Sequence, residues 1–247
     1  MKKIFQLLVV FYSFNMYGQD TYKPLLRYTY LRSDSIRFSS LDRMGISKKL
    51  IKGFSILRED NIKDFIEAQD LDSVAYLFVY NKDNKSLDSL FNCLRLHKSL
   101  KYLSIEKVDT IPKSIGKLSH LKWLSINDSW VTFLPDEIGN LIHLETLSLG
   151  YPYKHFNTGN RLSKLPSTMS SLKRLTRLYI WGNDLKEFPE VICQLDSLEV
   201  LDISGNELEN IPKCLLSLRN FKQISIRNNP LKEIPLFLKQ GKILISD

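Results

Sequence analysis

Apolar and polar residues follow one fixed order that is written three times between residues 175 and 235. The three stretches begin at Leu175, Leu198 and Phe221, so the pattern repeats every 23 residues. In each stretch the first, fourth and sixth positions are apolar, the ninth is Asn, and an apolar residue followed by Pro comes five positions later. A fixed period of this length is typical of a solenoid, in which each repeat forms one turn.

Each repeat predicts a short strand followed by a turn. Side chains alternate along a strand, so the fourth and sixth positions share one face. The Asn comes where the strand ends, and its amide can both donate and accept, so stacked Asn residues can satisfy backbone groups at the turns. The Pro then holds the backbone extended as the chain goes round the opposite side. The defining repeat positions are Leu175, Leu178, Ile180, Asn183, Leu198, Leu201, Ile203, Asn206 and Asn229.

Three earlier repeats follow the same pattern with local changes. They begin at Leu100, Leu121 and Leu144, and the first is two residues short between its strand and its Pro. In the second, Ser129 replaces the Asn, and the third carries an eight-residue excess that we place within residues 150–159. A further turn upstream has the spacing of a strand, followed by a helical apolar stripe that we expect in the core, made of Leu87, Leu90, Phe91 and Leu94.

These residues resemble the leucine-rich repeat family, whose 23-residue form reads LxxLxLxxNxLxxLPxxIxxLxx. About ten positions per turn agree over roughly residues 99–245, and this form is similar to bacterial and plant intracellular Ras-group repeats. The resemblance implies an α/β repeat solenoid, curved and right-handed, with a concave parallel β-sheet and an irregular or helical convex side. We assign residues 74–247 to this leucine-rich repeat solenoid.

The beginning of the chain predicts export. Lys2 and Lys3 precede an apolar stretch that is too short to span a membrane, and Gly18 is a plausible cleavage point, so residues 1–18 read as a signal peptide. A buried N-terminal helix or strand is the alternative. Residues 19–73 are expected to be an N-terminal capping region, or else a small ligand-binding domain. Because this start is similar to exported bacterial proteins, we expect a periplasmic, cell-surface or secreted location, and a cytoplasmic one if the segment is not cleaved.

Composition adds an excess of positive charge to this picture. The chain is 43% hydrophobic and 25% charged, with a formal net charge of +8. An acidic glycan would suit this charge, but Lys and Glu are interspersed and no basic run occurs, so we predict no nucleic-acid partner. The three cysteines include no CxxC pair and are expected to be small buried side chains. A bridge between Cys193 and Cys214, which lie in successive turns but offset by two positions, is the open alternative.

The resemblance places the side chains between the core positions on the concave face. Aromatic residues gather at the middle turns and in the insertion, and exposed Trp, Tyr and Arg are the usual anchors of protein interfaces. The open alternative is that these aromatics only cover the strands, with the insertion packed on them. The predicted partner-binding residues are Tyr102, Trp123, Tyr151, Tyr153, Arg177, Tyr179, Trp181 and Arg227.

No catalytic or metal-binding constellation emerges from the sequence. His120 and His143 are one repeat apart, but two histidines are an incomplete ligand set and polar residues fill this position in other repeats. We therefore expect no cofactor, no metal and no enzymatic activity. The predicted function is a non-catalytic binding scaffold that recognises a protein or peptide through its concave face. A cell-surface glycan or adhesion protein and a cytoplasmic regulator of signalling are the alternatives.

Overall fold

The computed structural model describes residues 10–12, 25–27, 54–58, 75–80, 85–150, 160–239 and 243–246. The chain divides into two compact units, Met1–Phe54 and Ser55–Asp247. In the first unit, strand β1 (Val10–Tyr12) pairs antiparallel with strand β2 (Leu25–Arg27). Most of the expected signal peptide and capping region lies outside the described residues, so the division at residues 18 and 73 stays a prediction.

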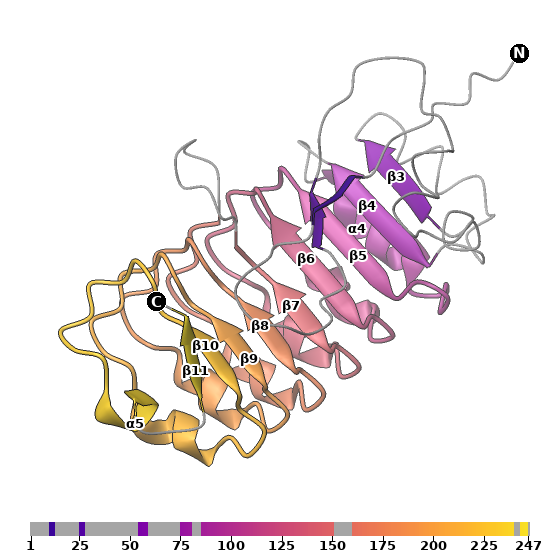
Figure 1. Ribbon diagram of the computed structural model, residues 1–247. Helices are drawn as coiled ribbons and strands as arrows, with labels where there is room; N and C mark the ends of the chain where they lie inside the picture. Colours follow the sequence, from indigo (N-terminus) through magenta and orange to yellow (C-terminus); the bar gives the residue numbers. More distant parts are fainter. Residues whose placement is uncertain are drawn as a thin grey trace, which may run out of the picture. The chain divides into compact units, whose positions relative to one another are not determined.

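The second unit is built on a nine-stranded sheet whose order is that of the sequence, from β3 to β11. Parallel pairing joins β4 to β11 without a break, as Figure 1 shows. The predicted strand of every regular repeat is confirmed. The strands are β3 (Phe54–Arg58), β4 (Tyr76–Tyr80), β5 (Tyr102–Glu106), β6 (Trp123–Asn127), β7 (Thr146–Ser148), β8 (Arg177–Tyr179), β9 (Val200–Asp202), β10 (Gln223–Ser225) and β11 (Leu244–Ser246).

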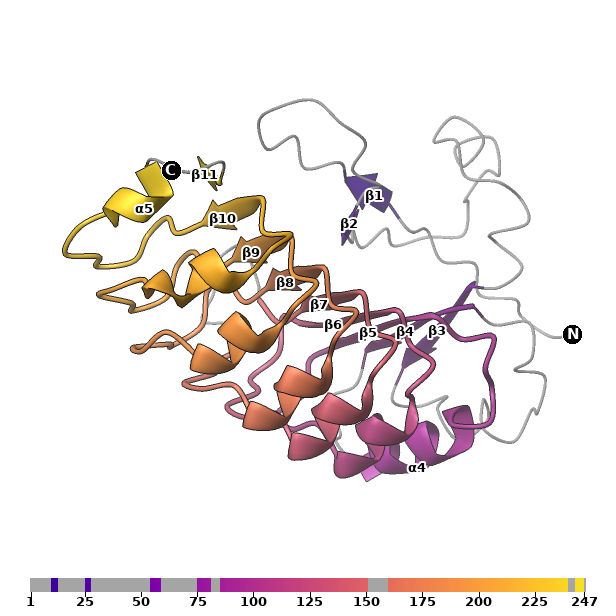
Figure 2. The ribbon, with the colours of Figure 1, turned by 90° about the horizontal axis from the view of Figure 1, so that it is seen from below.

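Helical turns line the face opposite the strands (Figure 2). Five of them are short 3-10 helices that each follow a Pro, whose fixed φ near −70° and extended ψ lead the chain into the turn. The predicted apolar stripe is confirmed in α4, where all four of its residues are buried. The helices are α4 (Lys85–Leu94), η2 (Lys113–Lys117), η3 (Asp136–Asn140), η5 (Ser167–Ser171), η6 (Glu190–Gln194), η7 (Lys213–Ser217) and α5 (Leu236–Lys239).

One continuous core runs through the stacked turns, between the sheet and the helices. The fourth position of each repeat lies directly beside its counterpart in the next strand, as Leu147, Leu178 and Leu201 do, and all three are completely buried. Because no turn buries its apolar face alone, each repeat depends on its neighbours, and removing one such Leu costs about 2–5 kcal/mol.

The Asn side chains form the ladder that the sequence predicts. Asn183 is completely buried; its Oδ1 accepts from the backbone N–H of Leu162 at 3.0 Å, and its Nδ2 donates to Leu149 O in the preceding turn at 3.1 Å. Asn160, Asn206 and Asn229 bond in the same way, one turn apart. Each amide therefore ties its own turn to the preceding one.

The two irregular early turns are explained by the same ladder. Ser129 stands in the Asn position, and its Oγ accepts from Val108 N at 3.3 Å and donates to Asn127 O at 2.9 Å. Val108 is buried in the turn that begins at Leu100. It takes the place of the Leu that comes two positions after the Asn in other turns. The two missing residues of that turn are therefore the ones around the Asn, directly after β5.

The residues before Asn183, Asn206 and Asn229 take a left-handed backbone conformation. Gly182 and Gly205 have φ of 65°, which glycine adopts without steric cost, and Asn228 has φ of 54°. In the early turns Lys107 and Asp128 adopt φ of 60° and 44°. A long side chain at such a φ is uncommon, so contacts around Lys107 must hold it there.

The expectation for the cysteines is wrong in one respect. Cys193 and Cys214 form a disulfide, with their Cα atoms 5.7 Å apart. Both lie in 3-10 helices of successive turns, η6 and η7, so the offset of two positions in the repeat does not move them beyond the reach of a bridge. Cys93 is a free thiol that is partly buried, and burial raises the pKa of its thiol. Among the described residues, no helix has the length and apolar character needed to cross a membrane.

Candidate partner-binding face

Three outward columns cover the sheet face that lies away from the helices. They arise because the third, fifth and seventh positions of each repeat alternate with the core positions. In-register pairing sets Tyr102 beside Trp123, Trp123 beside Thr146, and Thr146 beside Arg177. The predicted residues Tyr102, Trp123 and Arg177 thus belong to one column, and each side chain is partly exposed.

From β5 to β7 the middle column is made of serines, which lie between Phe78 of β4 and Tyr179 of β8. Ser104, Ser125 and Ser148 are buried on this face, and Ser148 Oγ donates to Asn127 Oδ1 at 3.1 Å. Tyr179 follows Ser148 in the column and is partly exposed. A large aromatic ring therefore stands directly beside a series of small side chains.

Tyr179 and Trp181 form an aromatic pair at the centre of the face. Their ring centroids are 5.4 Å apart and the planes are tilted by 48°, a separation at which aromatic pairs attract. Trp181 also packs against Gly150 of the preceding turn, where a Cβ would collide with the Trp181 carbonyl oxygen and indole ring. Trp181 lies so close to the backbone that only glycine fits at position 150. A larger residue there would displace Trp181.

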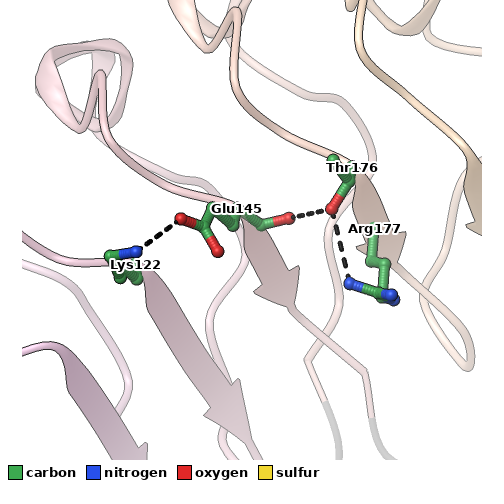
Figure 3. A network of polar contacts seen from close by, with 4 residues as sticks. All are labelled: Lys122, Glu145, Thr176 and Arg177. Atoms are coloured by element: carbon green, nitrogen blue, oxygen red, sulfur yellow. Dashed lines mark hydrogen bonds and ion pairs between the residues drawn. The ribbon is translucent and has the colours of Figure 1, made fainter. Parts of the chain in front are cut away.

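Arg177 lies at the edge of this aromatic pair. Its Nη1 donates to Thr176 Oγ1 at 3.5 Å, and Thr176 Oγ1 in turn donates to the backbone oxygen of Glu145 at 2.9 Å. Figure 3 shows this chain of contacts, which continues to Lys122, whose Nζ is 2.8 Å from Glu145 Oε1. In the described part of the chain no acid forms an ion pair with this guanidinium.

Asp202 is the buried carboxylate beside the aromatic pair. Its Oδ1 accepts from Ser204 N at 3.0 Å and from Ser204 Oγ at 2.6 Å. Burial raises the pKa of Asp202, while the hydrogen bonds from Ser204 and the charge of Arg227 act in the opposite direction. Arg227, another predicted residue, follows Ser204 in the seventh-position column, since Gly205 N donates to Arg227 O at 2.7 Å.

A polar cluster that the sequence did not indicate lies at the ends of β5 and β6. Lys107 Nζ is 2.7 Å from Asp128 Oδ2, in an ion pair whose side chains are only 18% and 15% exposed. The ammonium also lies 5.3 Å from the Trp130 ring centroid, within the range of a cation–π interaction. These contacts hold Lys107 in its left-handed conformation. Lys107 lies opposite Asp128 because the first repeat is two residues short. The repeat pattern does not show that these two side chains meet, so the cluster could not be predicted from the sequence.

Glu106 belongs to the same region and is neutral at neutral pH. Burial, and secondly the Asp128 carboxylate, raise the pKa of Glu106 to about 8, and Lys107 offsets this only in part. In β5 the residue of the seventh-position column is therefore an acid that can donate a hydrogen bond. In the outward columns from β5 to β10, the charges on partly exposed side chains at neutral pH are the guanidinium groups of Arg177 and Arg227.

Two predicted residues, Tyr151 and Tyr153, lie outside the described residues, so their place at this face stays a prediction. His120 is partly buried and its Nε2 has no hydrogen-bond partner. Burial lowers the pKa of His120, as do Lys101, Lys98, His97 and His143 around it. In the described part of the chain, no group of three or more His, Cys, Asp or Glu side chains is placed to hold a metal ion.

Comparison with known proteins places the chain in a family. The family model described as "Leucine-rich repeat region" matches residues 73–233. A search of curated proteins gives no match. Among solved structures, an internalin from Listeria monocytogenes is similar with a TM-score of 0.58 and 21% identity, covering 74% of this chain and 50% of the internalin. A chain of the TLR13–ssRNA13 complex is similar with a TM-score of 0.59 and 20% identity, covering 78% of this chain and 28% of that one.

Both identities are low, so these similarities support the fold alone, and the chain spans half of the internalin and 28% of the TLR13 chain. The family match covers well over half of the chain and includes β4 to β10. The repeated core, the Asn ladder and the parallel sheet occupy the same residues. The chain belongs to the leucine-rich repeat family.

Proposed function

We propose that this protein is a non-catalytic scaffold that recognises a protein or peptide through its concave sheet face. The observation that carries the proposal is the Tyr179–Trp181 pair, with ring centroids 5.4 Å apart, whose Tyr179 lies between the buried Ser148 and the buried Asp202. Aromatic side chains of this kind bury large areas at little cost in conformational entropy. Trp123 and Arg177 extend the same surface on either side of Thr146.

The rigidity of the sheet supports recognition by surface complementarity. The backbone of every outward residue is fixed by parallel pairing and by the Asn ladder, so little order is lost when a partner binds. Arg177 and Arg227 add positive charge near the aromatic pair. The partner that fits best therefore presents an apolar or aromatic group next to a carboxylate.

The experiment starts by identifying the partner in the native host. A photoreactive phenylalanine analogue at position 146 lies among the predicted anchors, and one at the exposed position of Phe133 (54% exposed) serves as a matched control. A partner cross-linked from position 146 alone is then purified for binding measurements.

Its dissociation constant is compared for the wild type, Tyr179→Ala with Trp181→Ala, and Arg177→Gln. We expect the aromatic double variant to weaken binding at least tenfold, as hot-spot residues do, and Arg177→Gln to weaken it less. Circular dichroism must show that both variants keep the wild-type fold. Unchanged affinity of a folded double variant would show that the concave aromatics are not the binding site.

Export of the protein is a second proposal, and the disulfide supports it. Disulfides persist in oxidising compartments and are rare in the cytosol of mesophiles, and Cys193 and Cys214 are bridged. Intact mass spectrometry of separated cell fractions tests the proposal. A chain beginning at Gln19 in the periplasmic, surface or secreted fraction is expected; a full-length chain with free thiols in the cytosol would refute export and favour an intracellular partner.

A further inference from the structure

The excess positive charge of the chain is concentrated on one edge of the solenoid. Four connecting segments, 97–101, 117–122, 140–145 and 171–176, lead into β5, β6, β7 and β8, and we call them the basic edge. Their only acid is Glu145, against six cations, which leaves a net charge of +5 of the formal +8 of the whole chain. The cations are Lys98, Lys101, Lys117, Lys122, Lys173 and Arg174.

Backbone pairing places the ends of these four segments in one line, in which two lysines are followed by Glu145 and the neutral Thr176. Lys122 N donates to Lys101 O at 2.9 Å and Glu145 N to Lys122 O at 2.8 Å, so these residues are neighbours in successive turns. Adjacent strands are about 4.8 Å apart, so four turns extend over roughly 14 Å. Figure 3 shows part of this line, with Lys122 beside Glu145.

Several cations of the basic edge lack a compensating acid. Lys122 is paired with Glu145, and Lys173 Nζ is 2.8 Å from Asp196 Oδ2. Within the described part of the chain, Lys98, Lys101 and Arg174 have no ion-pair partner, and Lys98 and Arg174 are exposed. Like charges held this close together raise the local potential and favour an anionic partner with repeated charges.

One histidine among these cations, His120, adds a dependence on pH. His120 is surrounded by Lys98, Lys101, His97 and His143, and burial together with these groups lowers its pKa. His120 is therefore neutral at pH 7. A bound anion would favour its protonated form, so protonation and anion binding reinforce each other as the pH falls below 6.5.

We propose that the basic edge binds an acidic polysaccharide, separately from the partner of the concave face. An extended polyanion can reach from the cations of segments 97–101 and 117–122 to those of segment 171–176, past the segment that holds His143 and Glu145. Between the two common polyanions, carbohydrate is favoured over nucleic acid because the disulfide between Cys193 and Cys214 suits an oxidising, extracellular environment. The choice of carbohydrate thus rests on the proposed export, whereas the anion site itself rests on charge and geometry.

The test uses the full chain and fluorescently labelled polyuronate oligosaccharides, with single-stranded DNA of the same length as the competing polyanion. Lys98→Gln with Lys101→Gln removes two uncompensated charges of the basic edge. Lys213→Gln with Lys239→Gln removes two exposed charges from η7 and α5 and is the matched control. Affinity is measured at 50 and 200 mM salt and at pH 7.5 and 5.5.

We expect the basic-edge variant to bind polyuronate at least tenfold more weakly, with a smaller dependence on salt, while the control binds as the wild type does. Binding by the wild type should strengthen at pH 5.5, and His120→Gln should reduce that gain. Equal losses in the two double variants, or no binding at 50 mM salt, would overturn the proposal. Tighter binding of DNA than of polyuronate would identify nucleic acid as the partner instead and overturn the choice of carbohydrate.

Discussion

Replacing Asn183 by Ala tests whether the Asn ladder holds the turns together. Asn183 is completely buried, and its side chain accepts one backbone N–H, from Leu162, and donates to Leu149 O, Ile180 O and Trp181 O. Alanine removes all of these bonds. The largest loss is at Leu162, whose N–H is left inside the protein with no acceptor.

The size of the expected loss in stability depends on which backbone groups keep a hydrogen-bond partner in Asn183→Ala. A buried N–H without a partner costs about 1–3 kcal/mol, and each lost hydrogen bond costs about 1 kcal/mol. Leu149 O still accepts from Asn160 at 2.8 Å, and Ile180 O from Asn206 at 2.9 Å, so these carbonyls are not left without a donor. We therefore expect Asn183→Ala to lower the free energy of unfolding by about 3 kcal/mol, most of it from Leu162.

Asn183→Ser is the informative companion, because Ser129 already occupies the equivalent position in an earlier turn. Its hydroxyl accepts the backbone N–H of Val108 at 3.3 Å, so a serine at position 183 should accept that of Leu162 and recover about half of the loss. Urea unfolding followed by circular dichroism measures both variants, and we expect the alanine midpoint to fall by about 1 M with an unchanged slope. Equal destabilisation by Ser and Ala would refute the assignment of the loss to the unpaired N–H.

Three further predictions concern charge, packing and the disulfide. The folded-state pKa of Glu106, about 8, lies above its ordinary value of 4.5, so stability should fall by roughly 2–5 kcal/mol as the pH rises from 4.5 to 8; Glu106→Gln should remove this slope in thermal melts. Gly150→Ala should cost about 1–3 kcal/mol in urea unfolding, because its Cβ collides with Trp181. Reduction, or replacing Cys193 and Cys214 by Ser, should cost about 3 kcal/mol for a 21-residue separation, and loss of less than 1 kcal/mol would contradict this.

The repeated part of the structure could be predicted because the same residue types recur at the same positions in each turn. Leu178, Leu201 and Ile224 recur at one position, and stacking buries all three completely. The ladder was predictable for a similar reason: an amide that donates and accepts is needed wherever a strand ends against another turn. Even Ser129 could be recognised as a substitute, since the residues around it kept the spacing.

What could not be predicted depends on contacts between turns that differ from one another. The disulfide needs Cys193 and Cys214 within reach although they occupy different repeat positions, and only the two 3-10 helices bring them there. The raised pKa of Glu106 arises from burial and from Asp128, a residue that the shortened turn places beside it. The spacing of residues within one repeat predicts neither the disulfide nor the raised pKa of Glu106, because both depend on how turns of different length align.

The solenoid separates the residues that hold the fold from those that can bind. Core positions and the Asn ladder fix the register, so a change at an outward position leaves the spacing of all the others intact. Residues 23 or 31 apart in sequence, such as Lys122 with Glu145 or Thr176 with Glu145, become direct neighbours. One outward face can therefore contain aromatic groups around Trp181 while the adjoining edge contains lysines, and the residues of each surface can be replaced without disturbing the other.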